Sequence, residues 1–264
     1  MNISRIYFSP TGTTDKITGQ VAEGLGGTIK DYNITLLKDR AKFKGLTFNS
    51  TDVVIVGAPV YSGRIPVFLS DFFSTLKGDG TLAIFTVMYG HRNYDDALLE
   101  LKNIFEARGF KGIAAGAFIG EHSFTEKVAT GRPDADDLSM ALKFGKDCSV
   151  ALEKLASNGK YELNVKGKFP YKERSQSQPM APQTNDRCNN CGICAENCPV
   201  EAIDFKDFRK VDAEKCIRCC SCIKKCPENA KAFNNDAFAK SVQWLVTNCT
   251  SVRKEPELFM LSSH

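Results

Sequence analysis

Residues 6–25 read "IYFSPTGTTDKITGQVAEGL" and join an apolar strand pattern to a helical pattern through a short loop of small and hydroxyl-bearing residues. The apolar run 3–8 predicts a buried strand, and Ile17, Val21 and Leu25 recur at the spacing of one helix face. Hydroxyls of the loop and backbone N–H groups at the start of the helix form an anion site suited to a phosphate. The loop lacks a P-loop lysine and the pattern G-x-G-x-x-G, so nucleoside triphosphate and dinucleotide sites fit poorly.

Strand and helix patterns alternate beyond this unit. After a short second strand in "GTIKDYNITL" (27–36), apolar strands are predicted in "TDVVIVGAPVY" (51–61), "GTLAIFTVMYG" (80–90) and "GIAAGAFIG" (112–120), each followed by an amphipathic helical pattern. Near-continuous apolar strands between such helices indicate a parallel sheet covered on both faces. We therefore expect an α/β fold with a flavodoxin-like doubly wound five-stranded parallel sheet in the order 2-1-3-4-5, and a ligand at the carboxyl ends of strands one and three.

Cysteines are concentrated in a second region. Nine of the eleven lie within 39 residues, in "CNNCGICAENCP" (188–199) and "CIRCCSCIKKCP" (216–227), which repeat the spacing C-x2-C-x2-C-x3-C-P at an interval of 28 residues. This is the spacing of bacterial two-cluster ferredoxins, in which the fourth cysteine of each motif binds the other [4Fe–4S] cluster. The predicted ligands of the first cluster are Cys188, Cys191, Cys194 and Cys226, and those of the second are Cys216, Cys219, Cys222 and Cys198.

Three cysteines fall outside this frame. For Cys220 the sequence favours a small buried thiol near a cluster over a swapped ligand or a redox role. Cys148 and Cys249 are predicted core residues of helices. The alternative for the whole set is a pair of zinc ribbons, which use two C-x2-C knuckles and need neither the middle cysteine nor the prolines.

Three loops meet at the predicted ligand edge, and their residues carry a resemblance. "SPTGTT" (9–14), "PVYSGRIP" (59–66) and "YGHRNYDDAL" (89–98) resemble the flavin-contacting loops of flavodoxins, over about residues 1–157. With the cysteine motifs and the tail "CTSVRKEPELF" (249–259), the whole chain is similar to the EFR1 family of flavodoxin–ferredoxin fusions found in anaerobes.

The resemblance implies FMN as a cofactor and assigns a role to each loop. The residues expected at the phosphate are Ser9, Thr11, Gly12, Thr13 and Thr14. Those expected beside the isoalloxazine are Pro59, Val60, Tyr61, Ser62 and Gly63 on one side, and Tyr89, Gly90, Arg92 and Tyr94 on the other. Tyr61 and Tyr89 are the stacking candidates, although either could be a core tyrosine. For His122 a solvated loop position is favoured over a proton donor beside the ring.

The sequence divides into four parts. We expect a flavodoxin-like FMN-binding domain at 1–157, a linker rich in Pro, Ser, Gln and Lys at 158–182, a small α+β two-cluster ferredoxin domain at 183–235, and an amphipathic helix with a tail at 236–264. The apolar face of that helix is expected to pack on the ferredoxin domain or across to the flavodoxin-like domain. No apolar run long enough for a membrane span and no signal-peptide pattern occurs, so the sequence predicts a cytoplasmic protein.

These features predict an electron-transfer protein that passes low-potential electrons between two [4Fe–4S] clusters, FMN and redox partner proteins. The alternative is a reductase that delivers hydride from FMN to a small organic acceptor, and a third reading is a metal-stabilised binding module without redox work. The formal charge of +4 arises from residues 158–264 and is offset by the cluster and phosphate charges. No stripe of interleaved basic and aromatic residues occurs, so no nucleic-acid partner is expected. The oligomeric state is not predicted.

Overall fold

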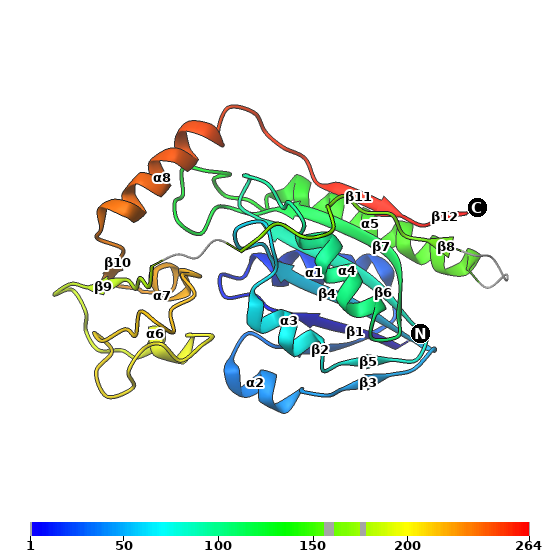
Figure 1. Cartoon of the computed structure of the whole chain (residues 1–264), viewed down its shortest axis with the longest axis horizontal. Helices are drawn as coiled ribbons and strands as arrows, with labels where there is room; N and C mark the ends of the chain where they lie inside the picture. Colours follow the sequence, from blue (N-terminus) through cyan, green and yellow to red (C-terminus); the bar gives the residue numbers. More distant parts are fainter. Residues whose placement is uncertain (1, 156–160, 175–177, 264) are drawn as a thin grey trace.

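The computed structural model describes residues 2–155, 161–174 and 178–263. Its centre is a six-stranded sheet with helices on both faces, and a small cysteine-rich module lies beside one end of the strands (Figure 1). In spatial order the strands are β2 (Thr28–Asn33), β1 (Asn2–Tyr7), β4 (Asp52–Pro59), β6 (Thr81–Tyr89), β7 (Phe110–Ile119) and β11 (Glu257–Met260).

The predicted order 2-1-3-4-5 is confirmed for the five parallel strands, which are β2, β1, β4, β6 and β7. The sixth strand was not predicted. β11 comes from the C-terminal tail and pairs antiparallel with β7, with Glu257 opposite Ala117 and Met260 opposite Ala114. The expectation of a five-stranded sheet was therefore incomplete, because four residues of the tail cover what would have been an open edge.

Two apolar cores hold helices against the sheet. One face is covered by α1 (Thr13–Leu25) and α5 (Ala135–Lys154), and the other by α2 (Leu37–Lys42), α3 (Val67–Phe73) and α4 (Ala97–Glu106). α1 and α5 lie in close contact, since a Cβ atom at Gly24 would come within 2.1 Å of the Leu142 carbonyl oxygen. Cys148 is buried in the core beneath α5, as predicted. A short parallel pair, β3 (Thr47–Phe48) and β5 (Lys77–Gly78), lies apart from the main sheet.

The cysteine-rich module has little regular structure. It contains β9 (Gln183–Thr184), which pairs antiparallel with β10 (Lys231–Ala232), and two single-turn helices, α6 (Ile193–Glu196) and α7 (Ser221–Lys224). In the preceding connector, β8 (Tyr161–Glu162) pairs with β12 (Ser262–Ser263). The predicted boundary between residues 157 and 158 lies outside the described residues, as do the predicted linker residues 158–160 and 175–177.

The chain then returns to the sheet through α8 (Asp236–Asn248), close to the helix predicted from the apolar spacing. Its apolar face packs on the loop after β7, where Leu245 and Cys249 form a small cluster with Val128. Phe124 of that loop meets Phe238 of α8 at a ring-centroid distance of 4.8 Å. The Phe238 ring also stacks on Phe233 of the module at a ring-centroid distance of 4.3 Å, so the helix contacts both of the expected surfaces. No helix among the described residues is long and apolar enough to cross a membrane.

The segment 249–256, which joins α8 to β11, is fixed by polar contacts. The buried His91 ring takes part in two of them, since Nδ1 lies 2.7 Å from the Cys249 carbonyl oxygen and Nε2 lies 3.0 Å from the Lys254 backbone N. A carbonyl only accepts and a backbone N–H only donates, so this pairing requires a neutral ring with its proton on Nδ1. Arg132 Nη1 donates to the Lys254 carbonyl at 2.6 Å, and Arg253 Nη1 donates to Asp134 Oδ2 at 2.7 Å.

We expect Phe259→Ala to lower the free energy of unfolding by about 2 kcal/mol, because the Phe259 ring is partly buried against the core on one face of the sheet. Urea unfolding followed by circular dichroism measures this change. The matched control is Phe205→Ala, which removes a ring that is 58% exposed and should cost much less. Equal losses in the two variants would mean that β11 contributes little to the sheet.

Candidate functional site

The loop that follows β1 places an open helix N-terminus at the carboxyl edge of the sheet. Gly12 has φ of 89°, a left-handed conformation that favours glycine, and α1 begins directly after it, so the N-cap residue itself has no side chain to bond the first N–H groups of the helix. Ser9 shapes the loop, since its hydroxyl accepts from the Asp15 N–H at 3.0 Å and its own N–H donates to Thr35 Oγ1 at 2.9 Å. The start of α1 can therefore bind an anion such as a phosphate.

The loop after β4 makes a tight turn that presents Tyr61. Tyr61 and Arg64 exchange backbone hydrogen bonds of 2.8 and 3.2 Å, and the residues between them, Ser62 and Gly63, have φ of 55° and 86°. Two successive positive φ values are typical of a type I′ turn. Arg64 holds the turn on α4, because its Nε and Nη2 donate to the buried Glu100 carboxylate at 2.7 and 2.8 Å.

The loop after β6 brings Tyr89 and Gly90 to the same edge. Tyr89 is buried, and burial with the nearby Glu257 carboxylate raises its pKa to about 12, so it remains a neutral phenol at pH 7. A Cβ atom at Gly90 would come within 2.6 Å of the His122 ring, so glycine permits this close approach. Arg92 on the same loop pairs with Asp95 at 2.6 Å.

The three loops border one cavity of about 640 Å³ at the carboxyl edge of the sheet. The predicted flavin residues that line it are Thr11, Thr13, Thr14, Pro59, Val60, Tyr61, Ser62, Tyr89, Gly90 and Arg92. Ser9, Gly12, Gly63 and Tyr94 are not among the lining residues. The Ser9 hydroxyl is engaged within its loop, Gly63 backs onto the Asp95 side chain, and the buried Tyr94 donates its hydroxyl to Glu257 Oε2 at 2.9 Å.

The wall of this cavity also contains His122, which the sequence favoured as a solvated loop residue. The ring is half-buried, because it lies between Gly90 and Phe124 and lines the cavity, so it is less solvated than expected. Burial, assisted by the Lys224 and Arg92 charges, lowers the pKa of His122 to about 4. Its Nδ1 accepts from the Phe124 N–H at 3.1 Å, so the neutral ring carries its proton on Nε2. Position in the loop after the last parallel strand was the only sequence signal for it.

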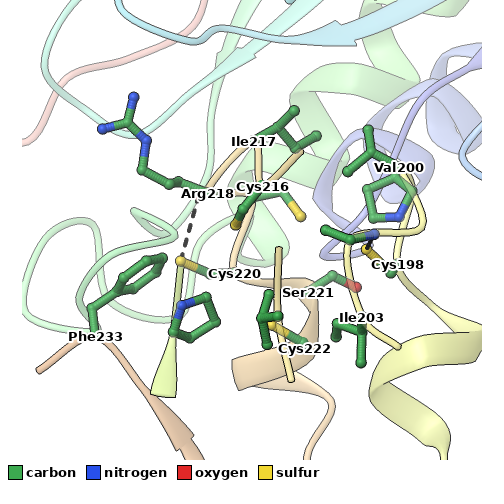
Figure 2. Close-up of a pocket in the computed structure, with 15 residues that line it drawn as sticks. Cys198, Val200, Ile203, Cys216, Ile217, Arg218, Cys220, Ser221, Cys222 and Phe233 are labelled. Carbon is green, nitrogen blue, oxygen red and sulfur yellow. Dashed lines mark hydrogen bonds between the residues drawn. The ribbon is translucent and has the colours of Figure 1, made fainter. Parts of the chain in front are cut away.

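The second ligand set surrounds a separate cavity in the module. Cys198, which belongs to the first motif, lines this cavity together with Cys216, Cys219 and Cys222 of the second motif (Figure 2). Apolar residues such as Ile203 and Val211 complete the wall. Figure 2 shows Cys220 at one side of this space, where its sulfur contacts the Arg218 carbonyl oxygen at 3.6 Å. Cys220 is buried near the predicted ligands, as expected of a small buried thiol.

The first ligand set surrounds another cavity, which is more polar and nearer the surface. Cys188, Cys191 and Cys194 line it together with Cys226 of the second motif. Cys191 is exposed, and the remaining wall includes Lys231 and Glu228. Within the described residues no three metal-ligating side chains converge on the position of a single ion. Four thiols around such a cavity are the donor set that a cubane cluster uses.

The two motifs share a backbone conformation, as a structural repeat requires. Asn190 and Arg218, which are 28 residues apart, have φ of 60° and 54°. The Cys198 sulfur accepts from the Ala202 N–H at 3.2 Å, and the Cys226 sulfur accepts from the Ala230 N–H at 3.2 Å. Hydrogen bonds to ligand sulfurs tune the potential of a bound cluster.

The repeat differs where Cys220, with φ of 62°, takes the position that Gly192 holds with φ of 80°. A side chain in this left-handed conformation costs free energy that glycine avoids. Burial raises the pKa of the Cys219 thiol to about 12 and raises the pKa of the Cys222 thiol. A bound cluster would offset the cost of burying these sulfurs as thiolates, because thiolates bind iron directly.

The module and the sheet meet at the larger cavity. Ile217, Arg218 and Cys219 of the second motif line the same cavity as the three sheet-end loops. α8 closes part of it with Lys240, Ser241, Trp244 and Leu245. The module is held there from two sides, since Arg40 Nη2 donates to the Pro199 carbonyl at 2.5 Å and Lys224 Nζ donates to the Glu121 carboxylate.

Comparisons with known proteins agree with this division of the chain. Residues 6–114 match the flavodoxin domain family, and residues 183–204 and 209–231 each match the 4Fe-4S binding domain family. No curated protein matches the chain. The flavodoxin domain implies FMN, and two 4Fe-4S motifs imply two [4Fe–4S] clusters. The residues present fit these groups, since a helix N-terminus with glycine as its N-cap residue adjoins an aromatic-lined cavity, and each smaller cavity is lined by the four predicted thiols, with Cys220 as a fifth in one of them.

Three solved structures illustrate the likeness of the first part of the chain. A flavodoxin from the domain Archaea is 12% identical, with 58% of this chain and 99% of that chain covered and a TM-score of 0.41. The flavodoxin of Streptococcus pneumonia TIGR4 is 16% identical, with 57% and 99% covered and a TM-score of 0.39. Rubredoxin oxygen:oxidoreductase from the anaerobe Desulfovibrio gigas is 16% identical, with 59% and 37% covered and a TM-score of 0.38. The family matches make this chain a flavodoxin–ferredoxin fusion, with the parts of a flavin and iron–sulfur electron-transfer protein.

Proposed function

We propose that this protein exchanges low-potential electrons with redox partner proteins at its cysteine-rich module and holds them at FMN. Iron–sulfur clusters take one electron each and a flavin takes one or two, so the fusion can convert single electrons into a stored pair. The observation that carries the proposal is the shared cavity. Residues of the second cysteine motif and the three flavin loops line the same space, so the two sites adjoin.

The residues that line each cavity are assigned to the cofactor that they would hold. Thr11, Thr13 and Thr14 with the N-terminus of α1 would hold the FMN phosphate, and Tyr61 and Tyr89 would lie against the flavin ring. The ten lining residues that the sequence predicted are retained, and Ser9 and Gly12 are assigned to shaping the phosphate loop. Each set of three cysteines from one motif and one from the other would hold a cluster.

We call Cys188, Cys191, Cys194 and Cys226 the outer cysteine set, and Cys198, Cys216, Cys219 and Cys222 the inner set. The outer set suits exchange with a protein partner. Cys191 is exposed, whereas the inner set adjoins the flavin cavity and its Cys219 is buried. A partner protein that docks over Cys191 would therefore reach the module without opening the larger cavity. The cytoplasm remains the predicted compartment, because clustered thiols hold metal in a reducing environment.

A second candidate function is reduction of a small organic acceptor. It is favoured by other residues of the cavity wall, where His122 offers an Nε2 proton and α8 adds Lys240 and Trp244. Trp244 is 53% exposed, so this side of the cavity reaches solvent. Anaerobic turnover with reduced ferredoxin and a panel of small acceptors separates the two functions. If the rate at which reduced ferredoxin is oxidised rises with acceptor concentration and saturates, the result favours the reductase. If no acceptor of the panel speeds this oxidation, the result favours the electron carrier.

The electron-transfer proposal predicts that Cys219→Ser slows flavin reduction by reduced ferredoxin at least tenfold, because Cys219 is a ligand of the inner set and lines the flavin cavity. Stopped-flow absorbance of the anaerobic protein measures the rate. The control is chemical reduction by dithionite, which should reduce the flavin fully in both proteins. An unchanged rate with ferredoxin would mean that electrons reach the flavin without this cysteine set.

The crossed ligand assignment predicts that intact protein holds about eight iron and eight sulfide per chain. We expect Cys198→Ser to alter the spectrum of the cluster held by Cys216, Cys219 and Cys222, because Cys198 lines their cavity. Cys220→Ser is the matched control and should leave both clusters assembled. Iron analysis and EPR of the reduced protein test both points, and loss of a cluster in Cys220→Ser would contradict the assignment.

The phosphate site predicts much weaker binding of riboflavin than of FMN. Several charge-assisted hydrogen bonds of about 1.5 to 3 kcal/mol each would be lost, partly replaced by water or free phosphate. Changing Thr11 and Thr13 together to Ala should reduce the ratio of the FMN affinity to the riboflavin affinity and leave the iron content unchanged. Fluorescence quenching of deflavinated protein measures both affinities. Equal affinities for FMN and riboflavin in the wild type would show that the loop is only a turn.

A further inference from the structure

Lys231 is a buried cation in the wall of the outer cysteine cavity. Its side chain belongs to β10, the residue is 3% exposed, and it lines the cavity together with Cys188, Cys191, Cys194 and Cys226. The ammonium donates to Thr184 Oγ1 at 2.7 Å and to the Phe208 carbonyl oxygen at 2.8 Å. Both acceptors are neutral, and no carboxylate among the described residues forms an ion pair with Lys231.

A buried ammonium without an anion is costly, so the compensating charge has to be found. Glu228 lines the same cavity, but it is exposed and its Oε1 accepts from Asn189 Nδ2 at 3.1 Å. The four thiols are the remaining candidates. As thiolates around an oxidised [4Fe–4S] core they would carry a net charge of about −2, and of about −3 after reduction by one electron.

The cysteine repeat places this lysine in the wall of one of the two cavities. Lys231 lies 28 residues after Ile203, and the two take equivalent positions in the two motifs. Ile203 lines the inner cavity and belongs to its apolar cluster, whereas Lys231 lines the outer cavity. Packing alone would be satisfied by an isoleucine at this position, so the lysine is explained by its charge.

We propose that Lys231 is a positioning residue that raises the reduction potential of the outer iron–sulfur site, held by Cys188, Cys191, Cys194 and Cys226. Reduction adds one negative charge, and the fixed ammonium stabilises the reduced state more than the oxidised state. This favours electron uptake at the site that we assign to the partner protein. The proposal rests on the ligand assignment of the proposed function.

The test is an EPR-monitored redox titration of the anaerobic holoprotein and Lys231→Met. At a fixed potential we expect the ratio of reduced to oxidised outer site to fall about tenfold, which is about 59 mV for a one-electron couple. The inner site should shift less, since Lys231 lines the outer cavity and its charge reaches the inner set through Cys222. Cys191→Ser identifies the signal of the outer site, because Cys191 belongs to that set alone.

Two further variants complete the test. Lys231→Arg keeps the charge and should restore most of the wild-type potential, and Lys210→Met removes a lysine whose side chain is 74% exposed and should leave both potentials unchanged. If Lys231→Met does not assemble both sites, Lys231→Gln removes the charge while keeping a hydrogen-bond donor. An unchanged outer potential in a variant with full iron content would overturn the role of Lys231 alone. Iron content of half or less in the wild type would instead overturn the ligand assignment.

Discussion

The pairing of β11 with β7 determines where the cysteine-rich module can lie. The connector stays packed on the sheet part as far as Arg174, whose Nη1 donates to the Ile65 carbonyl at 2.6 Å, and the chain returns to the sheet at β11, so the module and α8 lie between two fixed points. His91 and Arg132 hold the returning segment beside the flavin loops. Arg40 and Lys224 then hold the module itself against the same edge. A module on a free linker would sample many orientations. These contacts instead hold the module in an orientation in which Cys219 lines the larger cavity.

The repeat gives the module two similar ligand sets, and a few substitutions make them different. Both copies place a cysteine at the fourth position that reaches the opposite cavity, and both use a backbone N–H to the sulfur of that cysteine. The inner cavity has mostly apolar walls, with the half-buried Arg218 among its lining residues, and adjoins the flavin site, whereas the outer one has an exposed cysteine and the buried Lys231. Equal geometry with unequal charge is a means of separating two potentials within one small fold.

Sequence reasoning reached the features that depend on local pattern. Apolar runs gave the five parallel strands and their order, and cysteine spacing gave two sets that the structure does bring around two cavities. β11 could not be predicted in this way. Its four residues, which begin with Glu257, show no clear alternation of apolar and polar side chains, and the strand is stabilised by pairing with the edge of β7. His122 and Lys231 were also missed as site residues. Their importance lies in burial against distant segments, which spacing along the chain does not encode.

The balanced charge of the flavodoxin-like part fits with its attachment to the module in one chain. Residues 1–157 hold 18 basic and 18 acidic side chains, without the acidic excess typical of free flavodoxins. Long-range charge raises the rate at which separate proteins meet, and covalent linkage replaces that encounter with a high effective concentration. Between module and sheet, close contacts such as Lys224 with Glu121 suffice to set orientation. Selection for electrostatic steering would then act at the outer face of the module, around the exposed Cys191, where an external partner has to be found by diffusion.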